Sequence, residues 1–309
     1  MDLPRIAVVG ATGAVGRVFL EILEEREFPM ESLRLCASNR SLGKPLKVNN
    51  ETHVVELVSS ELLSETDIVF VAANSEISRK VAPIAVEQGA LVIDDSSSFR
   101  MDPTVPLVVP EVNASDLSEH QGIVSIPNCT TTPLVMILKP LHEKNPVKRV
   151  IVDTYQSVSG TGAAAINELL TQSENIMRKK QIETDQYPHQ IAFNVLPHVE
   201  PFTHNNYTNE EMKLVNETRK ILHSPEIKIS ATCVRVPVIV SHSEAVHIEF
   251  SKPIDPTDVR TILSEFPGIT VMDDPLSDVY PMAINAEGQD DVFVGRIRRD
   301  ISHPNGIAL

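Results

Sequence analysis

The stretch RIAVVGATGAVG, residues 5–16, decides the fold of this 309-residue chain. Residues 5–9 have the apolar character of a buried strand, and glycines stand at positions 10, 13 and 16 directly after it. Apolar residues then recur at the spacing of one helical face, at Val15, Val18, Phe19, Ile22 and Leu23. A strand that turns at once into an amphipathic helix is typical of the first unit of a parallel α/β sheet.

The first half of the chain repeats this alternation. We predict strands over residues 33–37, 67–73, 90–94 and 123–126, and a helix over residues 76–88. Residues 96–112 are rich in serine and proline and indicate a long connection. The pattern predicts a Rossmann-like, doubly wound parallel sheet over residues 1–127.

The pattern changes in residues 128–309, where we expect an α+β domain with a mixed, largely antiparallel sheet. Strands are predicted over 147–155 and 291–297, and helices over 163–177 and 255–266. Thr208 and Glu211 fit a capping box that opens a helix to about Leu222. The β-rich runs 229–240 and 245–250 are separated only by SHSE, which predicts that they pair antiparallel with each other.

Composition excludes several classes of protein. The net charge is −15, and Lys and Arg form no cluster with aromatic residues, so we expect no nucleic-acid partner. Three cysteines without framework spacing favour a reducing compartment over a disulfide scaffold. No apolar run reaches the length of a membrane span, and MDLPRIAVVG leads directly into a strand, so we expect a cytoplasmic protein with no membrane contact. We assign no residues to a metal.

The glycine loop predicts a dinucleotide site, because glycines between a strand and a helix let the backbone approach a pyrophosphate at the helix N-terminus. The end of the second strand, ASNRSLGK, offers hydroxyls and a cation but no carboxylate, which favours NADP over NAD. The alternative is that this segment is a solvent-exposed turn in which Arg40 has no role in cofactor binding. The cofactor-binding candidates are Gly10, Thr12, Gly13, Ala14, Val15, Gly16, Ser38, Asn39, Arg40 and Ser41.

Cys129 lies in SIPNCTTTP, at the joint between a strand and the start of a helix. Unpaired N–H groups at a helix N-terminus stabilise a thiolate over a thiol, which makes a nucleophile. Thr130, Thr131 and Thr132 are candidate caps, and Pro133 fits the first turn. The alternative for such a cysteine is a small buried apolar residue.

His242 and Arg235 are further candidates in VRVPVIVSHSEAVHIEF. His242 lies between two strand-like runs, where an imidazole can move protons near neutral pH, although a loop histidine is more often a plain surface residue. Arg235 stands seven residues earlier, so a continuous strand would point the two side chains to opposite faces, and a bend at Ser241 is required to bring them together. Its guanidinium suits a substrate carboxylate or an internal salt bridge.

These stretches together resemble the aspartate-semialdehyde dehydrogenases, from GATGAVG through SSSFRM, SIPNCTTTP, TNEEMKLVNETRKIL and ATCVRVPVIVSHSEAV to VGRIRRD. The resemblance implies that Cys129 is the nucleophile, His242 the general acid and base, and Gln156 in YQSVSG the group that orients the acyl group or its water. It further implies that Arg235 binds the substrate carboxylate and Glu210 its amino group. Phosphate contacts are implied for Arg100, Lys213 and Asn128. From spacing alone, Glu210 and Lys213 are an ordinary surface ion pair.

The implied reaction is the NADPH-dependent reductive dephosphorylation of β-aspartyl phosphate to aspartate semialdehyde through a cysteine thioester, in the biosynthesis of lysine, methionine and threonine. A homodimer or homotetramer is implied. Family members usually continue after the VGRIR strand into a loop and a helix that returns to the cofactor domain, whereas this sequence ends at Leu309, so we expect some apolar sheet surface to lack its cover. Two alternatives are an N-acetyl-γ-glutamyl-phosphate reductase and a non-catalytic homologue with a binding or assembly role.

Overall fold

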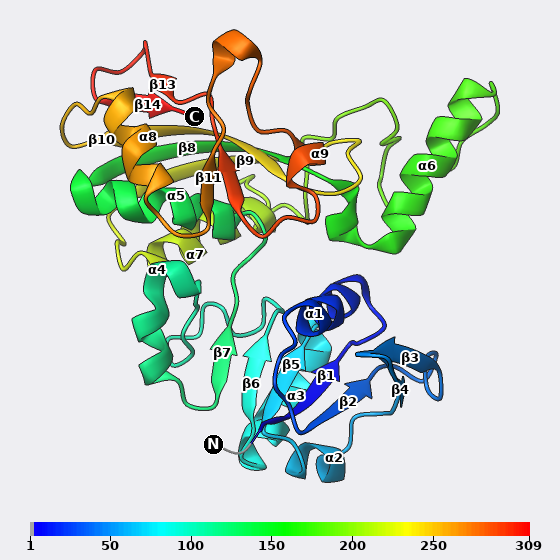
Figure 1. The fold of residues 1–309 in the computed structure, drawn as a ribbon. Coiled ribbons are helices and arrows are strands. Elements are labelled where there is room, and N and C mark those ends of the chain that lie inside the picture. Colours follow the sequence, from blue (N-terminus) through cyan, green and yellow to red (C-terminus); the bar gives the residue numbers. More distant parts are fainter. Residues whose placement is uncertain (1–2) are drawn as a thin grey trace. The chain divides into compact units, whose positions relative to one another are not determined.

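The computed structural model describes residues 3–309 (Figure 1). The chain divides into two compact units. The N-terminal unit comprises the chain up to Val109 together with Asn113–Pro127, and the C-terminal unit comprises Pro110–Val112 together with Asn128–Leu309. Within residues 3–309, no helix has both the length and the apolar character needed to cross a membrane.

The N-terminal unit is built on a parallel sheet of five strands in the order β2-β1-β5-β6-β7. Helices pack on both faces of this sheet, because successive side chains of each strand point to opposite sides. The doubly wound fold predicted from the glycine loop is therefore confirmed. The elements are β1 (Arg5–Val9), α1 (Ala14–Glu25), β2 (Ser32–Cys36), β3 (Pro45–Val48), β4 (Glu51–Val54), α2 (Ser60–Ser64), β5 (Ile68–Val71), α3 (Ser75–Glu87), β6 (Leu91–Asp94), η1 (Ala114–Glu119) and β7 (Ile123–Ser125). The short helix α4 (Pro110–Asn113) belongs to the C-terminal unit except for its last residue.

The buried face of α1 differs from the predicted one. The helix buries Gly16, Leu20 and Leu23, whereas Val15 and Val18 are about half exposed, at 48% and 52%. The reason is the close approach of α1 to the end of β1, where a Cβ on Gly16 would lie 2.3 Å from the carbonyl oxygen of Gly10. A prediction from hydrophobic spacing considers only apolar side chains, so it misses Gly16, whose lack of a side chain allows this close contact between α1 and the end of β1.

The C-terminal unit contains a mixed sheet in the order β13-β14-β10-β8-β9, in which β8 pairs parallel with β9 and antiparallel with β10. This mixed sheet confirms the predicted fold class. Helices α5 and α7 pack against each other and against the sheet (Figure 1). The elements are α5 (Thr131–Lys144), β8 (Val147–Gln156), η2 (Val158–Thr161), α6 (Ala163–Met177), α7 (Asn209–Ile221), β9 (Lys228–Arg235), β10 (Ser243–Phe250), α8 (Pro256–Ser264), β11 (Ile269–Val271), η3 (Pro275–Ser277), α9 (Ala283–Ala286), β12 (Val292–Val294), β13 (Arg298–Arg299) and β14 (Gly306–Ala308).

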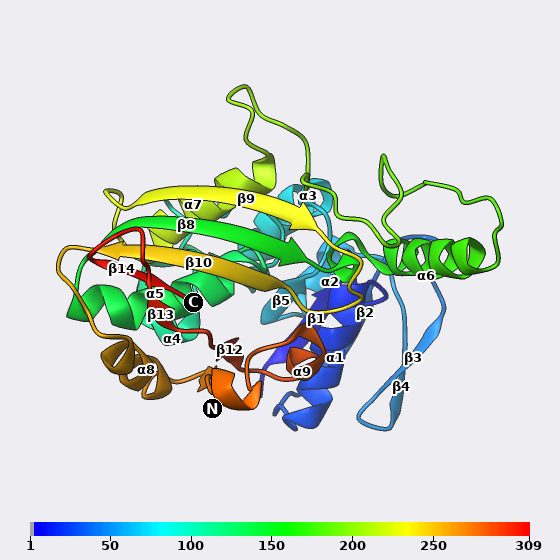
Figure 2. The same ribbon diagram turned by 90° about the horizontal axis from the view of Figure 1, so that it is seen from above.

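The predicted pairing of runs 229–240 and 245–250 is wrong. Strand β8 lies between β9 and β10 (Figure 2). β9 ends at Arg235, two residues before Pro237, which has no N–H to continue a ladder. The connection that follows is too long for a tight hairpin, so both strands pair with β8, whose Val150, Val152 and Thr154 are fully buried.

Candidate active site

Cys129 lies two residues before the first residue of α5, as the sequence predicts for a residue at the start of a helix. Its side chain is exposed, whereas Cys36 and Cys233 are buried, and burial raises the pKa of each of these two thiols to about 12. Among the three cysteines, therefore, only Cys129 offers an accessible sulfur at a helix N-terminus.

The residue that shapes the Cys129 loop is Asn128. Its Oδ1 accepts hydrogen bonds from the Thr130 backbone N–H at 2.9 Å and from the Thr130 hydroxyl at 2.7 Å. Thr130 occupies the N-cap position, but its hydroxyl does not cap the helix. The predicted threonine cap is thus replaced by an asparagine turn one residue upstream of the cysteine, whose Sγ lies 3.8 Å from Asn128 Oδ1.

Glu210, in the first turn of α7, connects several predicted site residues. Its carboxylate accepts hydrogen bonds from Asn128 Nδ2 at 3.1 and 3.2 Å, from Gln156 Nε2 at 2.9 Å and from Lys213 Nζ at 3.1 Å. Lys213 Nζ also lies 2.6 Å from Glu200 Oε1. Four of the predicted residues thus form one hydrogen-bonded cluster drawn from the Cys129 loop, β8 and α7.

The Glu210–Lys213 pair is buried, with side-chain exposures of 5% and 19%, and is not the surface ion pair that spacing alone suggests. Burial acts to raise the pKa of Glu210, but the charge of Lys213 and the hydrogen bonds from Gln156, Lys213 and Asn128 outweigh it, so the pKa falls below its usual range. Burial likewise opposes the charge of Lys213, but Glu210 and Glu200 raise its pKa. Both groups are therefore charged at neutral pH.

The bend required between Arg235 and His242 is present. Ser241 has a left-handed backbone with φ of 71°. A Cβ built on Gly160 would lie 3.4 Å from Arg235 Nη1 and 3.4 Å from His242 Nε2, so the two side chains converge on one point. Arg235 forms no ion pair with any residue that the structure describes, and its Nη1 donates to the Ser157 carbonyl oxygen at 2.6 Å.

His242 is a neutral group at physiological pH. Burial lowers its pKa to about 4, and the positive charge of Arg235 acts in the same direction. Glu210 and the backbone carbonyl of Ser241 oppose this shift but do not overcome it. The ring is partly buried and lies beside Arg235, so His242 is not the plain surface residue of the alternative.

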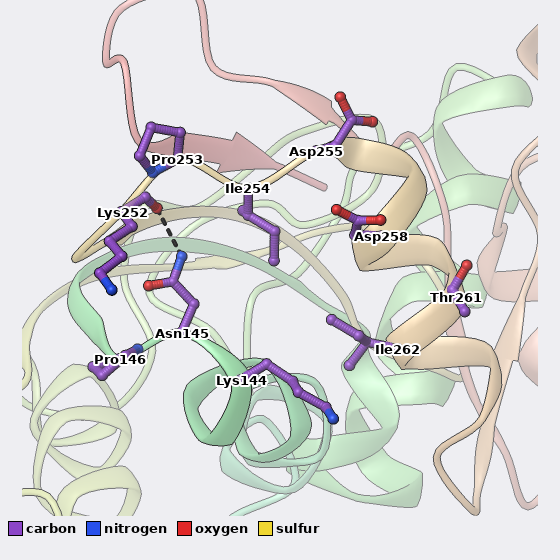
Figure 3. A pocket seen from close by; sticks show the side chains of 10 residues that line it. All are labelled: Lys144, Asn145, Pro146, Lys252, Pro253, Ile254, Asp255, Asp258, Thr261 and Ile262. Atoms are coloured by element: carbon purple, nitrogen blue, oxygen red, sulfur yellow. Dashed lines mark hydrogen bonds between the residues drawn. The ribbon is translucent and has the colours of Figure 1, made fainter.

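These side chains line a cavity of about 380 Å³ within the C-terminal unit. The predicted residues that line it are Asn128, Cys129, Gln156, Glu210, Lys213, Arg235 and His242. Cys129 and His242 also line a second cavity of about 580 Å³, so both side chains are accessible from two sides. A third cavity of about 540 Å³, where Asn145 Nδ2 donates to the Lys252 carbonyl, contains none of the predicted residues (Figure 3).

The glycine loop belongs to the N-terminal unit and has the geometry of a close backbone turn. Gly10 has φ of 92°, and a Cβ there would lie 2.1 Å from the carbonyl oxygen of Ala72. Thr12 Oγ1 lies 3.2 Å from Ser41 Oγ, which brings the loop and the predicted ribose-binding segment together. Gly13, Ala14 and Val15 are exposed at the start of α1, as are Ser38, Asn39 and Arg40 beyond β2. These residues fit a dinucleotide.

Arg100 also belongs to the N-terminal unit, where it is buried and donates from Nη2 to the Asp95 carbonyl oxygen at 2.8 Å. Burial raises the pKa of the Asp95 carboxyl to about 6, against the effect of the Arg100 charge. The phosphate contact implied for Arg100 stays a prediction.

Two buried residues of the site were not predicted. Glu217 Oε2 accepts from the backbone N–H of Asn128 at 2.7 Å. It follows Glu210 by seven residues, which is two helical turns, so a paired carboxylate on one face of the predicted helix was the available signal. Ser157, which contacts both Arg235 and His242, follows Gln156 directly and carried no signal.

Two family descriptions match the chain. "Semialdehyde dehydrogenase, NAD binding domain" matches residues 5–120, and "Semialdehyde dehydrogenase, dimerisation domain" matches residues 138–309. Together with the fold and the cysteine site, they define a nicotinamide-dependent oxidoreductase of the semialdehyde dehydrogenase class.

Individual relatives narrow this class. The aspartate-semialdehyde dehydrogenase of Aquifex aeolicus is 47% identical, over 99% of this chain and 91% of the relative. The crystal structure of aspartate semialdehyde dehydrogenase II from Vibrio cholerae is 44% identical and superposes with a TM-score of 0.96, over 100% of this chain and 92% of the other. The enzyme from Candida albicans, solved with NADP, is 27% identical with a TM-score of 0.76, over 99% and 92%. The chain belongs to the aspartate-semialdehyde dehydrogenase family.

Proposed function

We propose that this protein is an NADP-dependent aspartate-semialdehyde dehydrogenase that reduces β-aspartyl phosphate to aspartate semialdehyde through a thioester on Cys129. The observation that carries the proposal is the single cavity of about 380 Å³ that combines an exposed thiol, an imidazole, a guanidinium and a buried carboxylate. These are the groups needed to attack an acyl carbon and to hold an amino acid. The relatives named above favour this substrate over N-acetyl-γ-glutamyl phosphate, whose blocked amine would leave Glu210 without a role.

Substrate binding follows from charge. Arg235 Nη1 donates a hydrogen bond to the Ser157 carbonyl oxygen, and the guanidinium has further N–H donors that can bind the substrate carboxylate. Glu210 stays charged and is proposed to meet the substrate ammonium. The phosphate group is proposed to be bound by Lys213, Asn128 and Arg100. Lys213 and Asn128 donate hydrogen bonds to the Glu210 carboxylate in the structure, and in the proposed complex they would give up part of these hydrogen bonds to bind the phosphate.

The chemistry begins at the Cys129 sulfur. The thiolate attacks the acyl carbon, a C–S bond forms, and phosphate leaves with the electrons of the C–O bond, which produces a thioester. Gln156, held by Glu210 and by the Thr154 hydroxyl at 3.1 Å, orients the acyl group or its water. His242 is proposed as the general acid and base for the proton that the reacting oxygen or sulfur gains or loses.

The cofactor would be held by the N-terminal unit. Backbone groups of Gly10, Thr12, Gly13, Ala14, Val15 and Gly16 would bind the pyrophosphate, and Ser38, Asn39, Arg40 and Ser41 the ribose and its 2′-phosphate. When bound, the cofactor supplies the hydride that reduces the thioester. NADP is preferred because the 38–41 segment has no carboxylate to repel a phosphate, and the Candida albicans relative was solved with NADP.

The proposed organisation assigns residues 1–127 to cofactor binding and residues 128–309 to catalysis and dimerisation, in a homodimer or homotetramer. The proposed metabolic role is the biosynthesis of lysine, methionine and threonine. Both proposals follow from the aspartate-semialdehyde dehydrogenase family.

The test is phosphate-dependent reduction of NADP with aspartate semialdehyde. We expect Cys129→Ala to lose turnover by about a thousandfold or more, because the nucleophile has no substitute. Turnover that survives in Cys129→Ala would refute the covalent route, and no turnover by a correctly folded wild-type protein would favour the non-catalytic alternative.

Cofactor choice is tested separately by titrating the protein with NADP and with NAD. Arg40→Ala should weaken binding of NADP and leave NAD unchanged. Arg79→Ala, which removes an exposed arginine of α3 in the same unit, is the charge-matched control. Equal losses in the two variants, or tighter binding of NAD by the wild type, would contradict the role given to Arg40.

A further inference from the structure

Ser157 joins the His242 ring to the Arg235 guanidinium. This residue is fully buried and follows the end of β8 directly. Its backbone N–H donates to His242 Nδ1 at 3.0 Å, and its hydroxyl oxygen lies 3.0 Å from the same nitrogen. Its carbonyl oxygen accepts from Arg235 Nη1 at 2.6 Å. All three polar groups of one buried serine therefore contact the two side chains.

The contact with the backbone N–H has a definite consequence for the imidazole. A backbone N–H can only donate a hydrogen bond, so Nδ1 must present its lone pair. In a neutral imidazole one nitrogen is the donor and the other the acceptor. With Nδ1 as acceptor, the proton of neutral His242 resides on Nε2, the nitrogen that converges with Arg235 at Gly160 on the cavity of about 380 Å³.

We propose that Ser157 is a positioning residue that fixes His242 as the neutral Nε2–H tautomer, so that His242 enters the reaction as a hydrogen-bond donor. The inference rests on the proposed function for the identity of the reacting group, and it restricts the acid and base role proposed there for His242: at the start of the reaction Nε2 already carries a proton, so the ring donates from Nε2 and does not act as a base there. A ring held in this way donates from Nε2 to an oxygen or sulfur that gains negative charge. It accepts a proton only after the contact between Nδ1 and the Ser157 N–H is broken.

The surroundings of the ring agree with a neutral imidazole. A second proton on Nδ1 would point at the Ser157 N–H, and it would add a positive charge beside Arg235. The other titratable groups that line the two cavities with His242 include Cys129, Glu210 and Lys213, together with Glu244 of β10, whose pKa burial raises to about 8. Of these, the negative charge of Glu210 favours a protonated ring, but burial and Arg235 outweigh it and leave the pKa of His242 at about 4.

The direct test is NMR of the full chain labelled with ¹⁵N-histidine, in which long-range ¹⁵N–¹H correlations distinguish the two neutral tautomers and the imidazolium. The chain has ten histidines, so His242→Asn identifies the signals by their disappearance. The expected result at pH 7 is a protonated Nε2 and an unprotonated Nδ1. An Nδ1–H tautomer or an imidazolium at pH 7 would overturn the proposal.

Two variants separate the backbone contact from the hydroxyl. Ser157→Ala keeps the N–H and should preserve the Nε2–H tautomer. Ser157→Pro removes the N–H at a position whose φ of −65° is the angle that proline requires. It should lose the tautomer preference and raise the titration midpoint of His242 by about one pH unit or more, toward the ordinary value of about 6.5.

A folded Ser157→Pro protein with an unchanged tautomer and an unchanged titration midpoint of His242 would refute the role of Ser157. If that variant fails to fold, the wild-type and Ser157→Ala spectra test the proposal, because an Nδ1–H tautomer in either of them would refute it. These spectra need no turnover, so they are independent of the proposed function. An Nε2–H signal in a protein without dehydrogenase activity would refute the proposed function and leave the tautomer assignment intact.

Discussion

The glycine loop gives a quantitative prediction, because the chain contains a matched pair of glycines. Gly10 and Gly89 have almost the same backbone angle, with φ of 92° and 91°. A Cβ on Gly89 meets no atom within 4 Å, whereas a Cβ on Gly10 would lie 2.1 Å from the Ala72 carbonyl oxygen. Alanine therefore carries the same conformational cost at both positions, about 1–2 kcal/mol, but a steric conflict only at Gly10.

The steric conflict at Gly10 involves backbone, since Ala72 directly follows β5, the strand that pairs with β1. Ordinary contact with a Cβ needs roughly 3.4 Å, so the two chain segments must separate by about 1 Å, and overpacking of this kind costs about 1–3 kcal/mol or more. We expect Gly89→Ala to lower the free energy of unfolding by about 1–2 kcal/mol and Gly10→Ala by about 2–5 kcal/mol.

Urea unfolding, followed by circular dichroism, measures the free energy of unfolding of each variant. Titration with NADP measures the effect of each substitution on cofactor binding. Gly10→Ala should weaken NADP binding because the turn opens where the pyrophosphate is expected, while Gly89→Ala should bind as the wild type does. Equal stability losses in the two variants would refute the steric argument. A destabilised Gly10→Ala protein that binds NADP normally would refute the placement of the pyrophosphate at this turn.

Two further predictions concern buried charge and thiol access. Lys213→Met should lower the free energy of unfolding by about 2–4 kcal/mol at pH 7, because it leaves the Glu210 carboxylate without its cation. Folding lowers the pKa of Glu210, so the stability that its carboxylate contributes is complete above the unfolded pKa of about 4.3 and is lost as the pH falls below that value. The stability deficit of Lys213→Met should therefore shrink below about pH 4.3, and a deficit that stays constant from pH 7 to about pH 3 would contradict this. Iodoacetamide at pH 7 should modify Cys129 first, because Cys36 and Cys233 are buried thiols, and peptide mass mapping that finds Cys233 modified first would contradict the site.

The predictable parts of the structure are those written in local sequence. The parallel sheet follows from apolar runs and from the turn at Gly10. The capping box is confirmed as well: Thr208 Oγ1 accepts from the Glu211 N–H at 3.3 Å, and Glu211 Oε2 accepts from the Thr208 N–H at 2.7 Å. Each of these signals involves residues within about one turn of one another, which is the range over which propensity and spacing act.

The parts that sequence could not predict depend on partners distant in the chain. Ser157 and His242 are 85 residues apart, and Asn128 and Glu217 are 89 apart. The same limit explains the wrong strand pairing, since the insertion of β8 between β9 and β10 is a choice among topologies and not a property of either run. The convergence of Arg235 with His242 was nevertheless accessible, because the odd spacing demanded a bend.

Helix α7 shows how a local signal and long-range contacts combine to build the site. The helix carries three buried carboxylates, at Glu210, Glu211 and Glu217. Glu211 completes the cap and also accepts from the Cys233 N–H of β9 at 3.0 Å, so the motif that starts the helix also attaches it to the sheet. Glu210 and Glu217 then hold the side chain and the backbone of Asn128, the residue before the nucleophile. A buried carboxylate is stable only when its donors are in place, so the position of the Cys129 loop is tied to the packing of α7.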